Sequence, residues 1–135
     1  EWGELDYLII DLPPGTSDSP LTVMQALTLD GFIVVTTPQE LAIVDAKRSI
    51  NMIRTLKINV LGVVENYAGD IFGRGAGEEL AEETKLDFLG RIELRMDYRD
   101  MSMPTVLLSK PVRDEYQQLA EAVLRALQKA TPATL

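Results

Sequence analysis

Cysteine and histidine are both absent from this sequence of 135 residues. Without a thiol or an imidazole, the chain can supply neither a disulfide, nor a cysteine-ligated metal site or cluster, nor a Ser-His-Asp triad. The sequence also lacks an apolar run long enough to span a bilayer, and it does not open with a signal peptide. Because the lack of cysteine fits a reducing compartment, we expect a cytoplasmic protein with no membrane partner.

Basic residues are scarce as well. The chain has 13 Lys and Arg residues against 21 Asp and Glu residues, which gives a formal net charge of −8. An acidic surface repels a phosphate backbone, so we expect no nucleic-acid ligand. Hydrophobic residues make up 46% of the chain, which suits one compact domain with a buried core.

Four short apolar runs indicate β-strands, and the first three, which are continuously apolar, indicate strands that are buried on both faces. They lie at residues 7–10, 32–36, 60–64 and 88–92. Helical patterns fall between and after them, at about residues 21–29, 41–56, 78–85 and 111–129. This alternation predicts an α/β fold, with a mostly parallel sheet of about four strands and helices on both faces.

The second predicted helix carries two local signals. Thr37 and Glu40 have the spacing of a capping box, in which each side chain bonds the backbone amide of the other residue. The same helix should bury one apolar stripe. Its members are Ile43, Ala46, Ile50 and Ile53.

Candidate site residues follow the predicted strands, because ligands of open parallel sheets bind at the carboxyl ends of the strands. Asp11 follows the first strand, where a carboxylate can hold Mg²⁺ through a water molecule. Gly15, in the next turn, leaves its backbone amide accessible to a terminal phosphate. Asn66 follows the third strand and offers the donor and acceptor needed to read an adenine edge. From position alone, Asp11 could equally open a turn, and Asn66 could equally be an ordinary turn residue.

The glycine-rich segment at residues 73–77 does not fit a dinucleotide-binding fingerprint. Glu78 stands where the last glycine should be, and the segment does not directly follow a strand. We interpret it as a flexible helix entry that could make a secondary anion contact. No G-x-x-x-x-G-K-[ST] run occurs anywhere in the sequence, so these residues contain no P-loop.

Together these segments resemble a known family. Residues 2–16, which end in the run Asp-x-Pro-Pro-Gly-Thr, look like the switch II region of Mrp/ApbC ATPases. Those ATPases belong to a wider group with MinD, ParA and the nitrogenase iron protein. The similarity continues through Thr-Thr-Pro-Gln at residues 36–39 and Val-Glu-Asn at residues 64–66, and it covers nearly the whole chain in the family's order.

The resemblance implies a homodimeric ATPase that carries or assembles iron–sulfur clusters, with a P-loop NTPase fold of the deviant Walker A class. In that family, Asp11 would be the catalytic switch II aspartate near Mg²⁺. Gly15 would be the switch glycine near the γ-phosphate, and Asn66 the asparagine that reads adenine. ATP and Mg²⁺ would be the cofactors of the complete protein.

Three departures limit what the resemblance transfers. Family members usually carry Cys-x-x-Cys soon after the Glu-Asn pair, whereas residues 67–73 contain no cysteine, so this chain has no iron–sulfur ligands there. The usual proline after Ile92 is replaced by Glu93, and we do not expect a base-stacking role at that position. The family's N-terminal P-loop strand and its lysines are absent.

We therefore interpret residues 1–135 as a single partial domain, the C-terminal part of such an ATPase without its Walker A segment. The parent protein would hydrolyse ATP, and this chain alone should be inactive. In the family's fold the P-loop strand lies between the strands at residues 7–10 and 32–36. Without it, we expect these two strands to close up, or the chain to associate with a second copy or with the missing N-terminal segment.

Two other functions fit the same residues. The chain could be a non-enzymatic dimerisation or interaction domain that uses the family's old dimer surface. It could also come from a positioning ATPase like MinD or ParA, which normally needs a membrane-binding tail or a basic patch for DNA. The cations of the last predicted helix, Arg113, Arg125 and Lys129, are too few and too dispersed to favour that second function.

Overall fold

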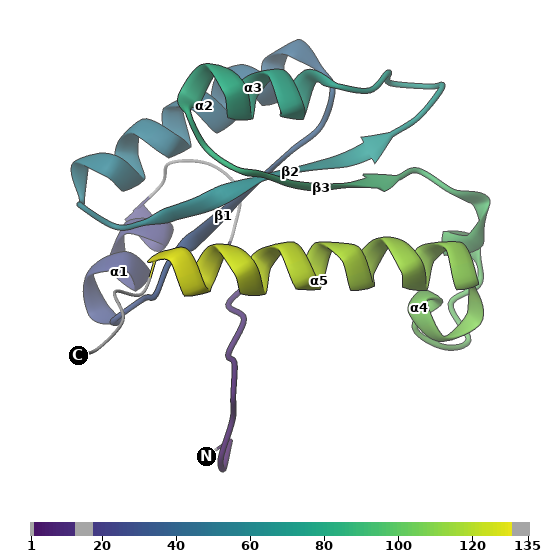
Figure 1. The fold of residues 1–135 in the computed structure, drawn as a ribbon, viewed down its shortest axis with the longest axis horizontal. Helices are drawn as coiled ribbons and strands as arrows, with labels where there is room; N and C mark the ends of the chain where they lie inside the picture. Colours follow the sequence, from purple (N-terminus) through teal and green to yellow (C-terminus); the bar gives the residue numbers. More distant parts are fainter. Residues whose placement is uncertain (1, 13–17, 131–135) are drawn as a thin grey trace.

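The computed structural model describes residues 2–12 and 18–130. Strands and helices alternate along the second range, as the apolar runs predicted (Figure 1). The elements are α1 (Asp18–Ala26), β1 (Phe32–Thr36), α2 (Glu40–Thr55), β2 (Val60–Ala68), α3 (Ala76–Thr84), β3 (Phe88–Glu93), the 3-10 helix η1 (Met96–Arg99), α4 (Thr105–Leu108) and α5 (Lys110–Ala130).

The three strands form one parallel sheet in the order β1-β2-β3. β2 is central, and each strand pairs with the strand that follows it along the chain. In register, Thr36 lies opposite Glu65, and Glu65 lies opposite Arg91. The α/β class and the parallel direction are therefore confirmed, and three of the predicted strands are present.

The predicted first strand is wrong. Residues 7–10 have no regular secondary structure, and β1 is an edge strand of the sheet instead of pairing with them. Residues 2–11 project away from the sheet as an extended chain, whereas Leu12 packs against the core cluster under α2 (Figure 1). A strand exists only where a neighbour satisfies its backbone N–H and C=O groups, and no described strand lies beside this segment. The expectation that it would close up against residues 32–36 is wrong for the same reason.

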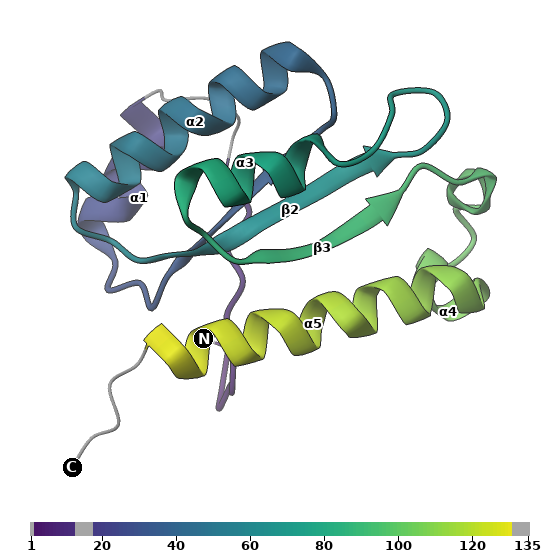
Figure 2. The same cartoon turned by 45° about the horizontal axis from the view of Figure 1, so that its top comes forward.

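Helices cover both faces of the sheet (Figures 1 and 2). α2 and α3 pack on one face, where the buried side chains form a cluster with Met24 of α1. α5 packs on the other face against β2 and β3. The predicted stripe of α2 is confirmed in the main, because Ala46, Ile50 and Ile53 are buried.

β1 is less well covered than its neighbours. Val34 points toward α2 and is 6% exposed, whereas Val35 on the opposite face is 59% exposed. On that face Ile33 packs against the cluster under α5, so β1 is covered there only in part. Among the described residues, this edge of the sheet thus has one free ladder of backbone groups and one partly covered face.

The predicted capping box at α2 is wrong. Gln39 is the N-cap residue, and no side chain bonds the helix end there. The hydroxyl of Thr37 donates instead to Oε1 of Gln39, at 3.0 Å. The helix begins at Glu40, one position earlier than the predicted start at residue 41.

Across residues 2–12 and 18–130, no helix is both long and apolar enough to traverse a lipid bilayer.

Candidate functional site

Polar residues gather where the three parallel strands end. Thr36 closes β1, Glu65 and Asn66 lie near the end of β2, and Arg91 lies near the end of β3. Parallel pairing brings these positions to one edge of the sheet, because the strands share one direction. This is the edge at which open parallel sheets bind their ligands.

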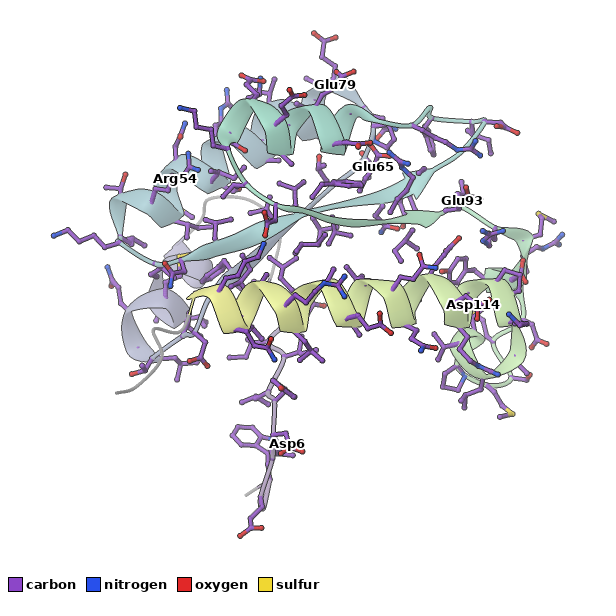
Figure 3. All side chains as sticks on the ribbon, in the orientation of Figure 1. Asp6, Arg54, Glu65, Glu79, Glu93 and Asp114 are labelled. Atoms are coloured by element: carbon purple, nitrogen blue, oxygen red, sulfur yellow. The ribbon has the colours of Figure 1, made fainter. Side chains whose placement is uncertain are left out.

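Glu65 is the centre of this edge. Its side chain is completely buried between the sheet and α3 (Figure 3). Oε1 accepts hydrogen bonds from the Gly75 amide at 3.0 Å and from Nε of Arg91 at 2.7 Å. Oε2 accepts from the Gly75 amide at 3.1 Å and from the Gly77 amide at 2.7 Å. The carboxylate therefore ties the end of β2 to the start of α3 and to β3.

These contacts decide the ionisation of Glu65. Burial alone raises the pKa of a carboxyl group, because the charged form loses its water. Here the hydrogen bonds from the Gly77 and Gly75 amides and the Arg91 guanidinium outweigh burial, and the pKa of Glu65 is lowered. The hydrogen bond to Glu65 likewise raises the pKa of Arg91. The pair is thus fully charged at neutral pH.

The glycine-rich segment 73–77 binds an anion, but the anion belongs to the protein. Gly75 is the N-cap of α3, with a left-handed φ of 100° that favours glycine. Gly77 lies so close to Glu65 that an added Cβ would stand 2.8 Å from the Glu65 Cβ. Because the amides of Gly75 and Gly77 already hold the Glu65 carboxylate, they are not available to a nucleotide phosphate.

Asn66 lies in the last part of β2, before a hairpin-like loop at residues 69–75. Its Oδ1 accepts a hydrogen bond from the Tyr67 amide at 2.9 Å, and Tyr67 has a left-handed φ of 57°. A pair of backbone hydrogen bonds between Gly69 and Gly73, 2.9 and 2.8 Å long, closes the loop further out. A carboxamide oxygen has two lone pairs, so Asn66 keeps one acceptor position and both Nδ2 protons for a ligand.

Glu93, which stands where the family usually has proline, is held by two arginines. Its carboxylate lies 3.2 Å from Nη2 of Arg95 and 3.5 Å from Nη2 of Arg74. Arg95 also donates through Nε to Glu115 of α5, at 3.1 Å. Glu93 therefore links the end of β3 to the hairpin-like loop and, through Arg95, to α5 (Figure 3).

The three predicted site residues do not share one described site. Asn66 lies at the carboxyl edge of the sheet, beside the end of β1. Asp11 is exposed and lies in the unpaired segment 2–12, so its predicted place at the end of a strand is wrong. Gly15 lies outside the residues that the structure describes. The roles predicted for Asp11, Gly15 and Asn66 stay predictions.

Sequence reasoning missed Glu65. The signal was present as one carboxylate directly after a run of apolar residues, with an arginine at the corresponding place in the next strand. Its two glycine partners follow ten or more residues later, and only the fold shows that their amides turn toward it.

A parallel sheet covered by helices on both faces, with polar groups at its carboxyl edge, defines an open α/β protein whose ligands bind at that edge. A family model described as ParA, NUBPL iron-transfer P-loop NTPase, matches residues 1–127. The chain belongs to this family. The resemblance to Mrp/ApbC-like proteins is confirmed by that match and by its relatives.

Several relatives are named for iron–sulfur cluster carriage. The iron–sulfur cluster carrier protein of Methanocaldococcus jannaschii is 43% identical, over 94% of this chain and 49% of that protein. The mouse iron–sulfur cluster transfer protein NUBPL is 38% identical, over 98% of this chain and 46% of that protein. The chain thus spans about half the length of these curated relatives.

A solved structure shares the fold. The nucleotide-binding protein of Archaeoglobus fulgidus, in complex with ADP, superposes with a TM-score of 0.62 at 36% identity. The match covers 97% of this chain and 50% of that protein.

Proposed function

We propose that these residues form the base-reading part of an ATP-binding protein that carries or assembles iron–sulfur clusters in the cytoplasm. The observation that carries this proposal is the position of Asn66 at the carboxyl edge of a parallel sheet shared with an ADP-bound protein. The names of the relatives support cluster carriage as the purpose of nucleotide binding.

In this proposal Asn66 reads the adenine edge through its free acceptor position and its Nδ2 protons. Asp11 holds Mg²⁺ through water, and the Gly15 amide contacts the γ-phosphate, as the family resemblance implies. When bound, Mg²⁺ neutralises phosphate charge. The amides of Gly75 and Gly77 are occupied by Glu65, so the phosphates are held by other groups, which the family resemblance implies to be a P-loop.

Cluster carriage needs ligands beyond these residues. The sequence contains no cysteine, and within residues 2–12 and 18–130 no group of three or more acidic residues could hold a metal ion. Thiolates are the usual ligands of iron–sulfur clusters. The cluster is therefore bound by another part of the full-length gene product, or by a second subunit of a homodimer.

The test compares two asparagines at opposite edges of the sheet. Asn66→Ala in the full-length gene product should weaken ATP binding about tenfold, which corresponds to the loss of one or two hydrogen bonds. Asn59→Ala is the matched control, because Asn59 is exposed and directly precedes β2 at the amino edge. Titration calorimetry with ATP and Mg²⁺ measures both dissociation constants.

Two results would overturn the proposal. The first is a full-length gene product that binds no ATP. The second is an equal effect of the two substitutions. Residues 1–135 alone should show no magnesium-dependent ATP hydrolysis, because they contain no Walker A lysine.

A second function is favoured by the exposed apolar residues of the segment 2–12 and by the free edge of β1. An interaction domain without enzymatic activity would use these surfaces to bind a partner. The coding sequence of the gene distinguishes the two functions. An initiator methionine and a stop codon that bracket only this segment favour the interaction domain. A glycine-rich loop with lysine encoded upstream favours the ATPase.

A further inference from the structure

β2 ends at Ala68, the chain turns back through the hairpin-like loop at residues 69–75, and the Glu65 carboxylate joins the strand to the far end of this loop at Gly75. The segment from Glu65 to Gly75 therefore contains Asn66, the end of β2 and the loop. Arg91 fixes the same carboxylate from β3, through a bond of 2.7 Å. The start of this segment therefore cannot move relative to α3 or β3 without breaking a buried, charged hydrogen bond.

Asn66 directly follows Glu65 in the chain, so the hydrogen bonds of Glu65 also restrict the backbone of Asn66. The one hydrogen bond described for the Asn66 side chain is accepted from the adjacent Tyr67 amide. This bond is local, so it does not tie Asn66 to another element. Asn66 is thus placed from two sides: by the contacts of the Glu65 carboxylate before it, and by the pairing of Ala68 with β3 after it, where the Leu94 amide donates to the Ala68 carbonyl at 2.9 Å. Of these two restraints, the Glu65 carboxylate is the one that a side-chain substitution removes.

The carboxylate cannot be replaced by a neutral group of the same shape. Both of its oxygens face donors: the Gly75 amide and Arg91 at Oε1, and the Gly75 and Gly77 amides at Oε2. A glutamine offers one acceptor oxygen and one donor nitrogen. Whichever way the glutamine amide turned, the Gly75 amide could keep an acceptor, but either Nε of Arg91 or the Gly77 amide would face the glutamine nitrogen and lose its acceptor. The tie between β2 and either β3 or α3 would then be weakened.

We propose that Glu65 is a positioning residue that sets the base specificity of the nucleotide site by fixing the backbone of Asn66. This inference rests on the proposed function, since it assumes that Asn66 reads the base. The side chain of Glu65 is completely buried and all its described hydrogen bonds go to the protein, so it acts through Asn66. It acts on the base contact alone, because the phosphates are held elsewhere.

The experiment uses the full-length gene product and its Glu65→Gln variant. Dissociation constants are measured for ATP, for GTP and for tripolyphosphate, which has no base. The variant should lose about tenfold of its preference for ATP over GTP, the effect of one or two displaced hydrogen bonds. Its affinity for tripolyphosphate should stay unchanged.

Glu78→Gln is the matched control. Glu78 is an exposed carboxylate that contacts Nη2 of Arg91 at 3.4 Å and makes no bond to the loop. Glu78→Gln should leave the preference for ATP over GTP unchanged from that of the parent. Arg91→Lys is a second, milder variant, because it keeps both glycine bonds of Glu65 and removes the Nε donor. It should shift the base preference in the same direction by a smaller factor, and it serves as the test if Glu65→Gln does not fold.

The outcomes separate the two proposals. If the parent protein binds no ATP, the proposed function fails. If the parent prefers ATP and both Glu65→Gln and Arg91→Lys keep that preference, only the positioning role fails. A variant that loses affinity for ATP, GTP and tripolyphosphate equally also overturns the role, because Glu65 would then support the whole fold and not the base contact.

Discussion

Two apolar runs of this chain are similar in composition, but one is a buried strand and the other is exposed and unpaired. Val63 in β2 is completely buried, whereas Ile9 in the segment 2–12 is 91% exposed. β2 has a paired strand on each side and helices on both faces, but no strand borders residues 7–10. The comparison teaches that apolar content marks a segment able to become a strand, and that its neighbours decide whether it does.

The largest expected effect is a difference in the free energy of unfolding between substitutions in these two regions. Ile50→Ala removes a completely buried side chain from the core between α2 and the sheet. It should lower the free energy of unfolding by about 3 kcal/mol, because a cavity remains in a packed core. Ile9→Ala, the matched control in the exposed segment, should change it by less than about 0.5 kcal/mol. Urea unfolding followed by far-UV circular dichroism measures both.

Equal effects at Ile50 and Ile9 would break the comparison. They would mean that the segment 2–12 packs as firmly as the core.

A smaller effect concerns the buried charge. At neutral pH, Glu65→Gln should destabilise the fold by about 2 kcal/mol, because buried hydrogen bonds to a charged group are lost. The pKa of Glu65 is lowered in the folded protein from an ordinary value of 4.5. The stabilisation is therefore present above that ordinary value and is lost as the pH falls below it, through the folded pKa.

Parent and Glu65→Gln unfolding curves should accordingly converge at acidic pH. Glu79→Gln is the control, since Glu79 is exposed on the same helix, α3 (Figure 3). A difference between parent and Glu65→Gln that stays constant down to pH values well below 4.5 would contradict the ion pair.

The smallest expected effect needs no substitution. Trp2 is the single tryptophan of the sequence and is 76% exposed. Iodide should quench its fluorescence as strongly in the folded chain as in the urea-unfolded chain. Circular dichroism checks that the urea sample is fully unfolded. Protection of Trp2 from iodide in the folded chain would show that the segment 2–12 has found a partner.

The three strands of residues 32–130 and the helices α2, α3 and α5 could be predicted from the sequence, because their patterns are local and their packing agrees with them, whereas the short helices η1 and α4 were not predicted. The strand at residues 32–36 was predicted at its observed bounds, and α2 and α5 differ from their predictions by one residue at each end. The strand at residues 7–10 could not be judged locally, since its existence depends on a neighbour. The capping box failed because Thr37 bonds the side chain of Gln39 in preference to the helix end.

The candidate site was predicted only in part. The place of Asn66 at the carboxyl edge could be predicted, because a polar residue near the end of an apolar strand is a local signal, and its adenine-reading role stays a prediction. Glu65 was not found, because its importance comes from Gly75, Gly77 and Arg91, which the fold brings to it from two other elements. Long-range hydrogen bonds of this kind leave no spacing rule in the sequence.

The order of the strands has a consequence for folding speed. Each strand pairs with its successor in the chain, so every pairing closes only one crossover, and the entropy lost in closing a loop grows slowly with its length. Sequential closure of short loops lowers the kinetic barrier relative to sheets that join distant segments. The unit from β1 to β3 can therefore nucleate before the amino-terminal segment has any ordered neighbour, and refolding rates should not change when residues 2–12 are removed.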